Sequence, residues 1–489
     1  MSLTAVAIPF STHPDFENTL RQLSQSSSIE RIYIFHDGSY ASSIQKCEGL
    51  KAGSMSSGVV LNSLFKRVES KYLLLVTQPG RIDFGQFALE QFLSVAEETN
   101  AGIVYSDFYD IENGERYEHP VNDYQIGSIR DGFDFGSVML FSVSAIRAAL
   151  KKYGSIPKVD GAGLYDLRLK LSIDRRVFHI REYLYSRTET HARVTGEKQF
   201  DYVDPRYHAI QKEMEATATK HLKNIGAYLK PKFMPVPNVK TKYPVEASVI
   251  IPVRNRVKTI AEAVDSALTQ QTDFSFNIIV VDNHSSDGTS EILNALSKKS
   301  PLVKHIVPQR VDLGIGGCWN EAVFSEHCGK YAVQLDSDDI YASGETLQRI
   351  INVFRSAKVA MVVGSYRLVN MKLEEIPPGI VDHKEWTPKN GRNNALRING
   401  FGAPRAFLTS LLREIPLANV SYGEDYRIAL RVSREYQIGR IYEPIYLCRR
   451  WEGNSDAELS TEKTNRNDAY KDMLRTIEIF ARQKINRKG

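Results

Sequence analysis

Six short blocks of this 489-residue chain recur in the same order in its two halves, and this repeat limits the possible folds most. Residues 5–9, AVAIP, match 248–252, SVIIP, and the Phe-Gly pair at 135–136 matches 401–402. The offset runs from 243, between Pro9 and Pro252, to 266, between Phe135 and Phe401. The other four matches join 32–39 to 278–285, 71–76 to 330–335, 102–106 to 360–364 and 165–169 to 424–428. The shared order and spacing predict two copies of one fold.

Each copy alternates short apolar runs with stretches of helical periodicity. Residues 331–335, YAVQL, suit a buried strand, and the apolar residues within 259–268 recur at helical spacing. Strands and helices in alternation predict an α/β fold, in which a mostly parallel sheet is covered by helices on both faces.

Changes in composition along the chain predict four segments. Residues 1–200 and 246–460 are the two large domains, and residues 201–245 connect them. The connector combines a helical stretch with three prolines between 231 and 237, which favour an extended, semi-rigid segment. Residues 461–489 form a C-terminal helix, expected from about 462 to 483, and a basic tail.

Bulk properties exclude several classes of protein. The net charge of +5 is small for this length and does not favour nucleic acid as a partner. The four cysteines lack metal-site spacing, so we expect reduced thiols in a cytoplasmic protein. We find no secretion signal and no apolar run near the roughly 18 residues of a spanning helix. The basic end, residues 482–488, leaves contact with the inner membrane surface open, although we favour a solvated helix end.

The predicted strand at 331–335 ends in three carboxylates, Asp336, Asp338 and Asp339. Open α/β sheets bind ligands at this end of their strands. In an extended chain Asp336 and Asp338 would point the same way, about 6–7 Å apart. Carboxylates so close repel each other unless a cation lies between them, which predicts a Mg²⁺ or Mn²⁺ site that also holds a diphosphate. The alternative is an acidic turn in which Asp339 or Ser343 caps the next helix.

The second copy resembles the family 2 glycosyltransferases, which have the GT-A nucleotide-sugar fold. The resemblance covers about residues 245–460 and rests on four motifs in order: ASVIIPVRN at 247–255, VVDNHSSDGT at 280–289, GIGGCWN at 314–320 with the Asp-x-Asp at 336–338, and GED at 423–425. It implies two GT-A-like domains, of which the first is a degenerate copy.

The resemblance also implies how a nucleotide-diphospho-sugar is held. Asp282 matches the residue that reads the base, and a carboxylate can accept from uracil or guanine N–H groups. The alternative is that Asp282 caps its own loop. By the same resemblance Asp338 binds Mn²⁺ or Mg²⁺, and Asp336 faces the sugar or the metal shell. The remaining nucleotide-sugar residues implied are Pro252, Arg254, Asn255, Gly316, Asn320 and Arg450.

Glu424 and Asp425 stand at the start of a predicted helix. Asp425 matches the catalytic base of the family, with Glu424 beside it. A carboxylate opposite the leaving diphosphate deprotonates the acceptor hydroxyl and gives inversion at the anomeric carbon. The alternative is an acidic helix start favoured by the helix dipole, and both interpretations can hold together.

Residues 448–455, CRRWEGNS, depart from the family, which often has a histidine there as a further metal ligand. Glu452 could bind the metal instead, or Arg449 and Arg450 could hold the diphosphate. Residues 383–401 are expected where the acceptor enters, because they look too polar for a core. We expect Trp386 and Trp451 to serve core packing more than sugar stacking.

The first copy lacks these residues. TQPG at 77–80 stands where the second copy has DSDD at 336–339, and His36 stands where Asp282 does. Only Asp166 persists, opposite Asp425. We therefore predict that the first copy lacks transferase chemistry and binds the acceptor glycan or braces a dimer.

Together these features predict an inverting, metal-dependent glycosyltransferase. Its donor would be UDP- or GDP-linked, and its acceptor a glycan or lipid-linked hydroxyl in polysaccharide or glycoconjugate synthesis. One alternative is a sugar nucleotidyltransferase, although its usual Gly-rich loop is absent at 254–258, RNRVK. The other is a non-catalytic carbohydrate-binding or scaffold protein. The sequence leaves open whether the protein forms a homodimer.

Overall fold

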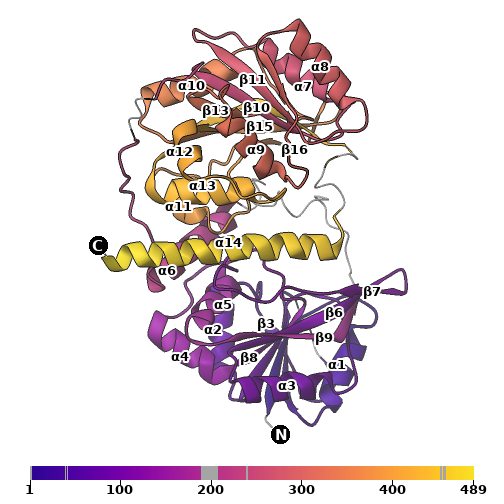
Figure 1. Cartoon of the computed structure of the whole chain (residues 1–489). Coiled ribbons are helices and arrows are strands. Elements are labelled where there is room, and N and C mark those ends of the chain that lie inside the picture. Colours follow the sequence, from indigo (N-terminus) through magenta and orange to yellow (C-terminus); the bar gives the residue numbers. More distant parts are fainter. Residues whose placement is uncertain are drawn as a thin grey trace. The chain divides into compact units, whose positions relative to one another are not determined.

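The computed structural model describes residues 3–38, 40, 42–188, 208–237, 241–451, 454 and 459–488. These residues form two compact units (Figure 1). Unit 1 contains the described residues up to 188, then 208–228 and 459–488, and unit 2 contains 229–237, 241–451 and 454.

Unit 1 is built on one sheet flanked by helices. Its strands are β1 (Thr4–Pro9), β2 (Ile29–His36), β3 (Cys47–Lys51), β4 (Tyr72–Val76), β5 (Arg81–Phe84), β6 (Ile103–Glu112), β7 (Glu115–His119), β8 (Val138–Ser142) and β9 (Val177–Thr188). Its helices are α1 (Phe16–Gln25), α2 (Gly58–Arg67), α3 (Ala88–Thr99), α4 (Val143–Tyr153), α5 (Gly163–Asp174), α6 (His208–Asn224) and α14 (Thr461–Lys488). The strand order is β3-β2-β1-β4-β8-β6-β9-β5, with β7 paired to β6.

Unit 2 repeats this plan. Its strands are β10 (Ala247–Val253), β11 (Phe276–Asp282), β12 (Val303–Ile306), β13 (Tyr331–Gln334), β14 (Ile340–Tyr341), β15 (Met361–Val369), β16 (Glu375–Val381), β17 (Arg405–Leu408) and β18 (Ile438–Arg449). Its helices are α7 (Ile260–Leu268), α8 (Thr289–Lys299), α9 (Ile315–Phe324), α10 (Thr346–Ser356), α11 (Gly391–Asn394), α12 (Thr409–Glu414) and α13 (Glu424–Glu435). The strand order is β12-β11-β10-β13-β17-β15-β18-β14, with β16 paired to β15.

The two sheets have the same strand order and the same pairing directions. In each, the first four strands in the order are parallel, and the next strand, β8 or β17, runs antiparallel to both of its neighbours. The expected α/β class is confirmed, and the sheets are mixed rather than uniformly parallel. In unit 1 no helix lies between β6 and β8 along the chain, because antiparallel partners do not need the crossover connection that parallel pairing needs.

Burial follows the sequence pattern. All five residues of β4 and all seven of β11 are buried, as expected for central strands covered on both faces. Helix α10 buries Leu347, Ile350, Ile351 and Phe354, a spacing that places them on one face of the helix. These apolar faces form the cores that fix the strand ends in each unit.

Helix α14 packs on residues 120–130 of unit 1. Asn465 donates to the carbonyl of Pro120, at 2.5 Å from Nδ2 to O, and the Ser128 hydroxyl donates to Asp472 at 2.9 Å. At Gly127 a Cβ atom would lie 2.1 Å from the Asp472 carbonyl oxygen, so only glycine allows this close approach. The helix runs to Lys488, five residues beyond the expected end. Within the described ranges, no helix is both long and apolar enough to span a membrane.

Candidate active site

The acidic stretch after β13 forms a turn. The strand ends at Gln334, and the Asp339 N–H donates to the Asp336 carbonyl at 3.2 Å. The expectation that Asp336 and Asp338 lie on an extended strand is therefore wrong, because the chain turns after Leu335. The turn nevertheless keeps the two carboxylates close enough for the Asp338 charge to raise the pKa of Asp336.

Asp336 lies at the centre of a charged cluster. Burial raises its pKa, the Asp338 and Asp425 charges add to this, and Arg405 and Gln334 oppose it without cancelling it. Gln334 Nε2 donates to both carboxylate oxygens at 2.9 and 3.0 Å. The Asp336 N–H donates to the Tyr446 hydroxyl at 2.9 Å. The acids expected to act together therefore do share one site.

Arg405 joins the acidic turn to the start of α13. Its Nη1 atom lies 2.6 Å from Asp425 Oδ2, and its backbone N–H donates to Gln334 Oε1 at 3.1 Å. Burial alone would lower the pKa of Arg405, but Asp425, Asp336 and Glu424 outweigh it and raise the pKa. Sequence reasoning missed Arg405, since residues 403–405, APR, form no motif. The antiparallel pairing of β17 with β13 places it beside Gln334.

Glu424 is buried beside this ion pair. Its Oε2 atom has no hydrogen-bond partner among the described residues. Burial and the Asp425 charge raise the pKa of Glu424 to about 8. At neutral pH Glu424 therefore keeps its proton, whereas the guanidinium of Arg405 compensates the charge of Asp425. Two adjacent carboxyl groups thus have different environments, an arrangement typical of acid–base sites.

Asp338 is partly exposed, as Asp336 is, whereas Asp339 is buried. Its Oδ2 atom lies 3.3 Å from Asn454 Nδ2 and 3.6 Å from Arg256 Nε. Beneath the turn, the buried Arg449 donates to the Asp338 carbonyl and pairs with Glu262, and its N–H donates to Asp339 Oδ1 at 2.8 Å. Arg449 therefore fixes the turn from below. Arg256, which sequence reasoning quoted without giving it a role, pairs with the carboxylate of Asp338.

Asp282 is completely buried at the end of β11. Its carboxylate accepts from the Ser285 N–H at 3.0 Å, from the Ser290 hydroxyl, and from His305 Nε2 at 3.4 Å. Burial raises its pKa, but these hydrogen bonds outweigh burial and lower it. The contacts favour the alternative in which Asp282 holds its own loop. Its role in reading a base stays a prediction.

Gly316 and Asn320 have counterparts in unit 1 that make the same contacts. A Cβ atom on Gly316 would lie 1.9 Å from the Ala418 carbonyl oxygen, as one on Gly58 would from that of Pro157. Asn320 exchanges two hydrogen bonds with the backbone of Leu417, at 2.9 and 3.0 Å. Asn62 does the same with Ile156, at 2.8 and 3.3 Å. Packing of the loop before α13 explains both residues, and a role in nucleotide binding stays a prediction.

The other residues expected to bind the nucleotide-sugar lie near the ends of β10 and β18. Pro252 pairs beside Val281, and Arg254 is exposed. Asn255 adopts a left-handed conformation, with φ of 55°, and its Oδ1 accepts from the Ser286 N–H at 2.8 Å. The backbone N–H of Arg450 donates to the Val369 carbonyl at 2.8 Å. Glu452 lies outside the described residues. A role of these residues in binding the nucleotide-sugar stays a prediction.

The expectation that residues 383–401 are too polar for a core is wrong. His383, Trp386 and all of 391–398 are buried. Protein groups satisfy several of their polar atoms, which lowers the cost of burial, although Asn394 Nδ2 has no hydrogen-bond partner among the described residues. Arg392 donates to the Lys232 carbonyl at 3.0 Å, and Asn393 exchanges hydrogen bonds with the Leu229 backbone at 3.0 and 2.9 Å. Trp386 packs against Phe401, 5.4 Å between ring centroids, as expected for core packing.

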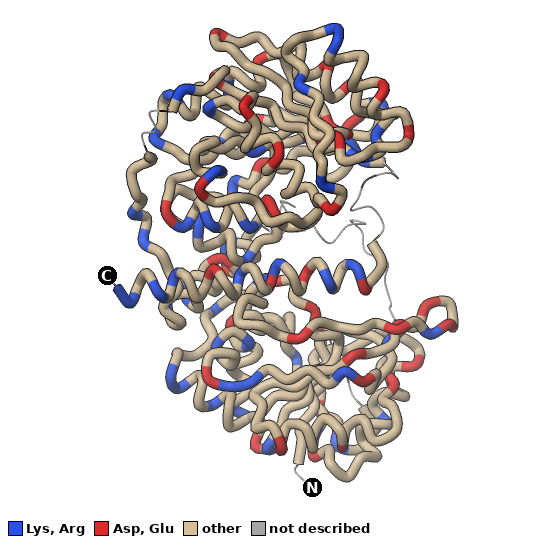
Figure 2. Tube along the Cα trace, in the orientation of Figure 1, with Lys and Arg blue, Asp and Glu red and all other residues tan. Residues whose placement is uncertain are grey.

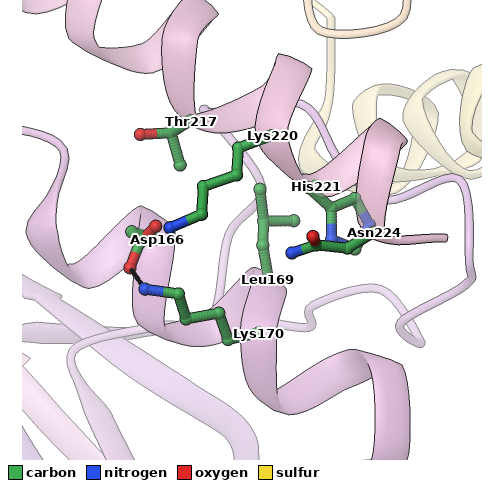
Figure 3. Close-up of a pocket in the computed structure, with 7 residues that line it drawn as sticks. All are labelled: Asp166, Leu169, Lys170, Thr217, Lys220, His221 and Asn224. Carbon is green, nitrogen blue, oxygen red and sulfur yellow. Dashed lines mark hydrogen bonds and ion pairs between the residues drawn. The ribbon is translucent and has the colours of Figure 1, made fainter. Parts of the chain in front are cut away.

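In unit 1, Asp166 occupies the first turn of α5, as Asp425 does in α13. Figure 3 shows it between the amine of Lys170, with which it pairs, and Lys220 of α6. The pocket there is also lined by Leu169, Thr217, His221 and Asn224. Burial lowers the pKa of His221 to about 4, so its ring is neutral. Asp166 is therefore neutralised by lysine and covered by α6.

These observations define unit 2 as an α/β unit with a carboxylate-rich site at its strand ends. Residues 248–414 match the glycosyl transferase family 2. Residues 248–414 are therefore a glycosyl transferase family 2 domain, as the resemblance of the second copy implied.

Among curated proteins, the chain is similar to a poly(ribitol-phosphate) beta-glucosyltransferase of Bacillus spizizenii, 26% identical over 210 residues, or 42% of this chain and 32% of that one. It is also similar to a hyaluronan synthase of Pasteurella multocida, 31% identical over 29% of this chain and 14% of that one. The chain thus spans a third or less of these relatives. A solved structure, S. aureus TarS 1-349 with UDP-GlcNAc, is 24% identical with a TM-score of 0.39, over 48% of this chain and 66% of that one.

Proposed function

We propose that unit 2 is an inverting, metal-dependent glycosyltransferase that moves a sugar from a nucleotide-diphospho-sugar to a hydroxyl acceptor. The observation that carries this proposal is the cluster of Asp336, Asp338, Arg405, Glu424 and Asp425 at the ends of β13, β17 and α13. A sugar hydroxyl is too weakly acidic to attack unaided, so the reaction needs a positioned base.

Asp425 is the proposed base. Its contact with Arg405 favours the ionised carboxylate, which is the form able to accept the hydroxyl proton. Glu424, which keeps its proton at neutral pH, can donate a hydrogen bond to a sugar hydroxyl. Attack assisted from the face opposite the leaving diphosphate gives inversion. In this scheme the two neighbouring acids have different roles because their surroundings differ.

The proposed cation is Mn²⁺ or Mg²⁺, held by Asp338 with Asp336 behind it. Among the described residues, no group of three His, Cys, Asp or Glu side chains is placed to hold a metal. Magnesium in nucleotide sites often takes one or two carboxylates and completes its shell with phosphate oxygens. The residues present fit a cation on those terms, which would neutralise charge on the leaving diphosphate. Mn²⁺ should therefore bind at least about tenfold tighter with UDP or GDP present, as calorimetry can measure.

The donor is proposed to be UDP- or GDP-linked, and the acceptor a glycan or a lipid-linked hydroxyl. The names of the similar proteins, a poly(ribitol-phosphate) glucosyltransferase and a hyaluronan synthase, support a role in polysaccharide or glycoconjugate synthesis. We place this activity in the cytoplasm, at the inner membrane surface where lipid-linked acceptors are available.

Unit 1 is proposed to be a second copy of the same fold without transferase chemistry. The shared strand order and pairing directions support duplication, and Thr77 and Gln78 at the end of β4 support the loss of a metal site. Binding the acceptor glycan and bracing a dimer are its two candidate roles.

The test is release of nucleoside diphosphate from a panel of UDP- and GDP-sugars with Mn²⁺. We expect turnover with one donor by the native protein and its loss in Asp338→Asn. Asp273→Asn is the matched control, because this exposed residue pairs with Arg355 on the surface. Pyrophosphate as the product would show a nucleotidyltransferase instead. No product with any donor or acceptor would favour a binding protein.

A further inference from the structure

Helix α14 exposes a row of large apolar side chains. Met473, Ile477 and Phe480 are 39%, 54% and 51% exposed. Their spacing of four and three residues places them on one face of the helix, one turn apart. The opposite face, which includes Arg475, Glu478 and Arg482, is buried. The helix thus directs an apolar face to solvent, beyond what packing in unit 1 requires.

Basic side chains bracket this row. Arg466 is exposed before it, and Lys484, Arg487 and Lys488 are exposed after it. Figure 2 shows basic positions in blue at the C-terminal end of the chain. The acidic residues of α14 that follow Arg466 are ion-paired or buried. Asp468 pairs with Arg130 at 3.1 Å, and Asp472 and Glu478 are buried. Only Glu462, in the first turn, is an exposed acid of α14. The face is apolar in its centre and positive at both ends.

The basic end is held on unit 1 as part of a continuous helix. Gln483 Nε2 donates to the Ile225 carbonyl at 2.7 Å, and Asn486 Nδ2 donates to the Gly226 carbonyl at 2.8 Å. The lysines and the arginine therefore keep a fixed position relative to Met473, Ile477 and Phe480. A flat surface that carries negative charges above an apolar layer can contact all of these side chains at once.

A second copy of the chain fits this face poorly. In a two-fold dimer the same patch meets itself, so each basic end needs an acidic partner on the same patch. Antiparallel pairing of two α14 helices would set Arg466 against Lys484 and Arg487, and parallel pairing would set each end against itself. Three side chains also offer far less than the roughly 800 Å² per partner of a stable interface.

We propose that this face of α14 binds the surface of an anionic phospholipid membrane. Met473, Ile477 and Phe480 enter the boundary between headgroups and acyl chains, and the basic residues contact the lipid phosphates, as in helices that lie in the interface plane. The inference is independent of the proposed reaction, because lipid binding is measured without donor or acceptor.

The test is flotation of the full-length protein with vesicles of phosphatidylcholine alone or with phosphatidylglycerol. We expect binding only to the anionic vesicles and weaker binding at high salt. The triple variant M473Q/I477Q/F480Q and the variant K484E/R487E/K488E should each bind at least about tenfold more weakly. Val59→Gln, which changes an exposed residue of α2, is the matched control and should bind like the native protein.

Circular dichroism and thermal unfolding of each variant separate lost binding from lost folding. Absence of binding by the native protein, or equal binding by a folded triple variant, would overturn the proposal. So would a native dimer, seen by light scattering, that the triple variant converts to a monomer, because the face would then join two copies.

Discussion

Strand β4 in unit 1 and strand β13 in unit 2 have the same position in the strand orders of their sheets, but different residues follow them. In unit 2, Asp336 and Asp338 follow the strand and meet Arg405 and Asp425. In unit 1, Thr77 and Gln78 follow it. There Arg187 reaches across, with Nη1 3.1 Å from Gln78 Oε1 and Nε 2.6 Å from Asp110 Oδ1.

His119 completes the cluster in unit 1. It lies 2.5 Å from Asp110 and 3.2 Å from Asp134, and its ring stacks on Phe108 at 4.2 Å. Burial alone would lower its pKa, but the two carboxylates outweigh burial and raise it to about 9. In this cluster two acids are balanced by two cations, Arg187 and His119.

The charge balance teaches what separates the two sites. In unit 2 Asp425 pairs with Arg405, and Asp338 lies 3.6 Å from Arg256, while Asp338 and Asp425 both raise the pKa of Asp336. Carboxylates that raise one another's pKa favour a bound cation, whereas in unit 1 Arg187 and His119 already pair with Asp110 and Asp134. The loop-packing roles of Gly316 and Asn320, by contrast, recur in Gly58 and Asn62. The two units therefore share their scaffold and differ in their charge.

The largest difference should appear when the matched acids of α13 and α5 are changed. We expect Asp425→Asn to lower kcat about 10³-fold, because the amide cannot accept the acceptor proton. Asp166→Asn should leave kcat within about twofold, since Asp166 is paired with Lys170 and covered by α6. Steady-state release of nucleoside diphosphate measures both. Equal losses in the two variants would mean that both units take part in catalysis.

The two arginines give the next test. We expect Arg405→Gln to lower kcat about 10²-fold, since the ionised form of Asp425 loses its nearest cation. The pH at which activity appears should also rise, and Arg405→Lys should restore part of the loss. Arg187→Gln is the unit 1 control and should lower the melting temperature but not kcat. An unchanged pH profile in Arg405→Gln would show that Arg405 serves stability alone.

Stability against pH should reveal the buried acid of unit 2. The pKa of Glu424 is raised to about 8, so its contribution to stability is complete below its unfolded value and lost as pH rises to about 8. The free energy of unfolding should fall by up to about 1.4 kcal/mol per pH unit over this range. Glu424→Gln, which imitates the protonated acid, should remove that fall in urea titrations. A fall of equal slope in the variant would show that Glu424 is ionised in the folded protein.

The smallest effect is expected in unit 1, from His119. Its pKa of about 9 exceeds the ordinary value, so its stabilising contribution is complete below about pH 6.5 and lost as pH rises through 9. The native protein should lose about 3 kcal/mol over this interval, and His119→Gln should lose little. Thermal unfolding at several pH values measures this, with kcat at neutral pH unchanged in the variant as the control.

The α/β class and the acids at strand ends could be predicted from the sequence, because apolar periodicity is a local property; that the two units are copies of one another stays a prediction. The order of the strands could not be. Asp336 and Asp338 were predicted to lie close together, and they do. The prediction assumed an extended strand, whereas the chain forms a turn there. Residues 391–398 were expected at the surface because polarity alone does not show that backbone carbonyls will satisfy buried side chains.

By itself the sequence determined which carboxylates stand after which strand, and that the first copy lacks them. Only the tertiary structure decided that Arg405 lies against Asp425, because an antiparallel pairing brings the start of β17 beside the end of β13 across about seventy residues. It also decided that burial and Asp425 raise the pKa of Glu424 and that Asp282 is enclosed by its own loop. Desolvation and charge proximity depend on distances in space, and these follow from packing rather than from order along the chain.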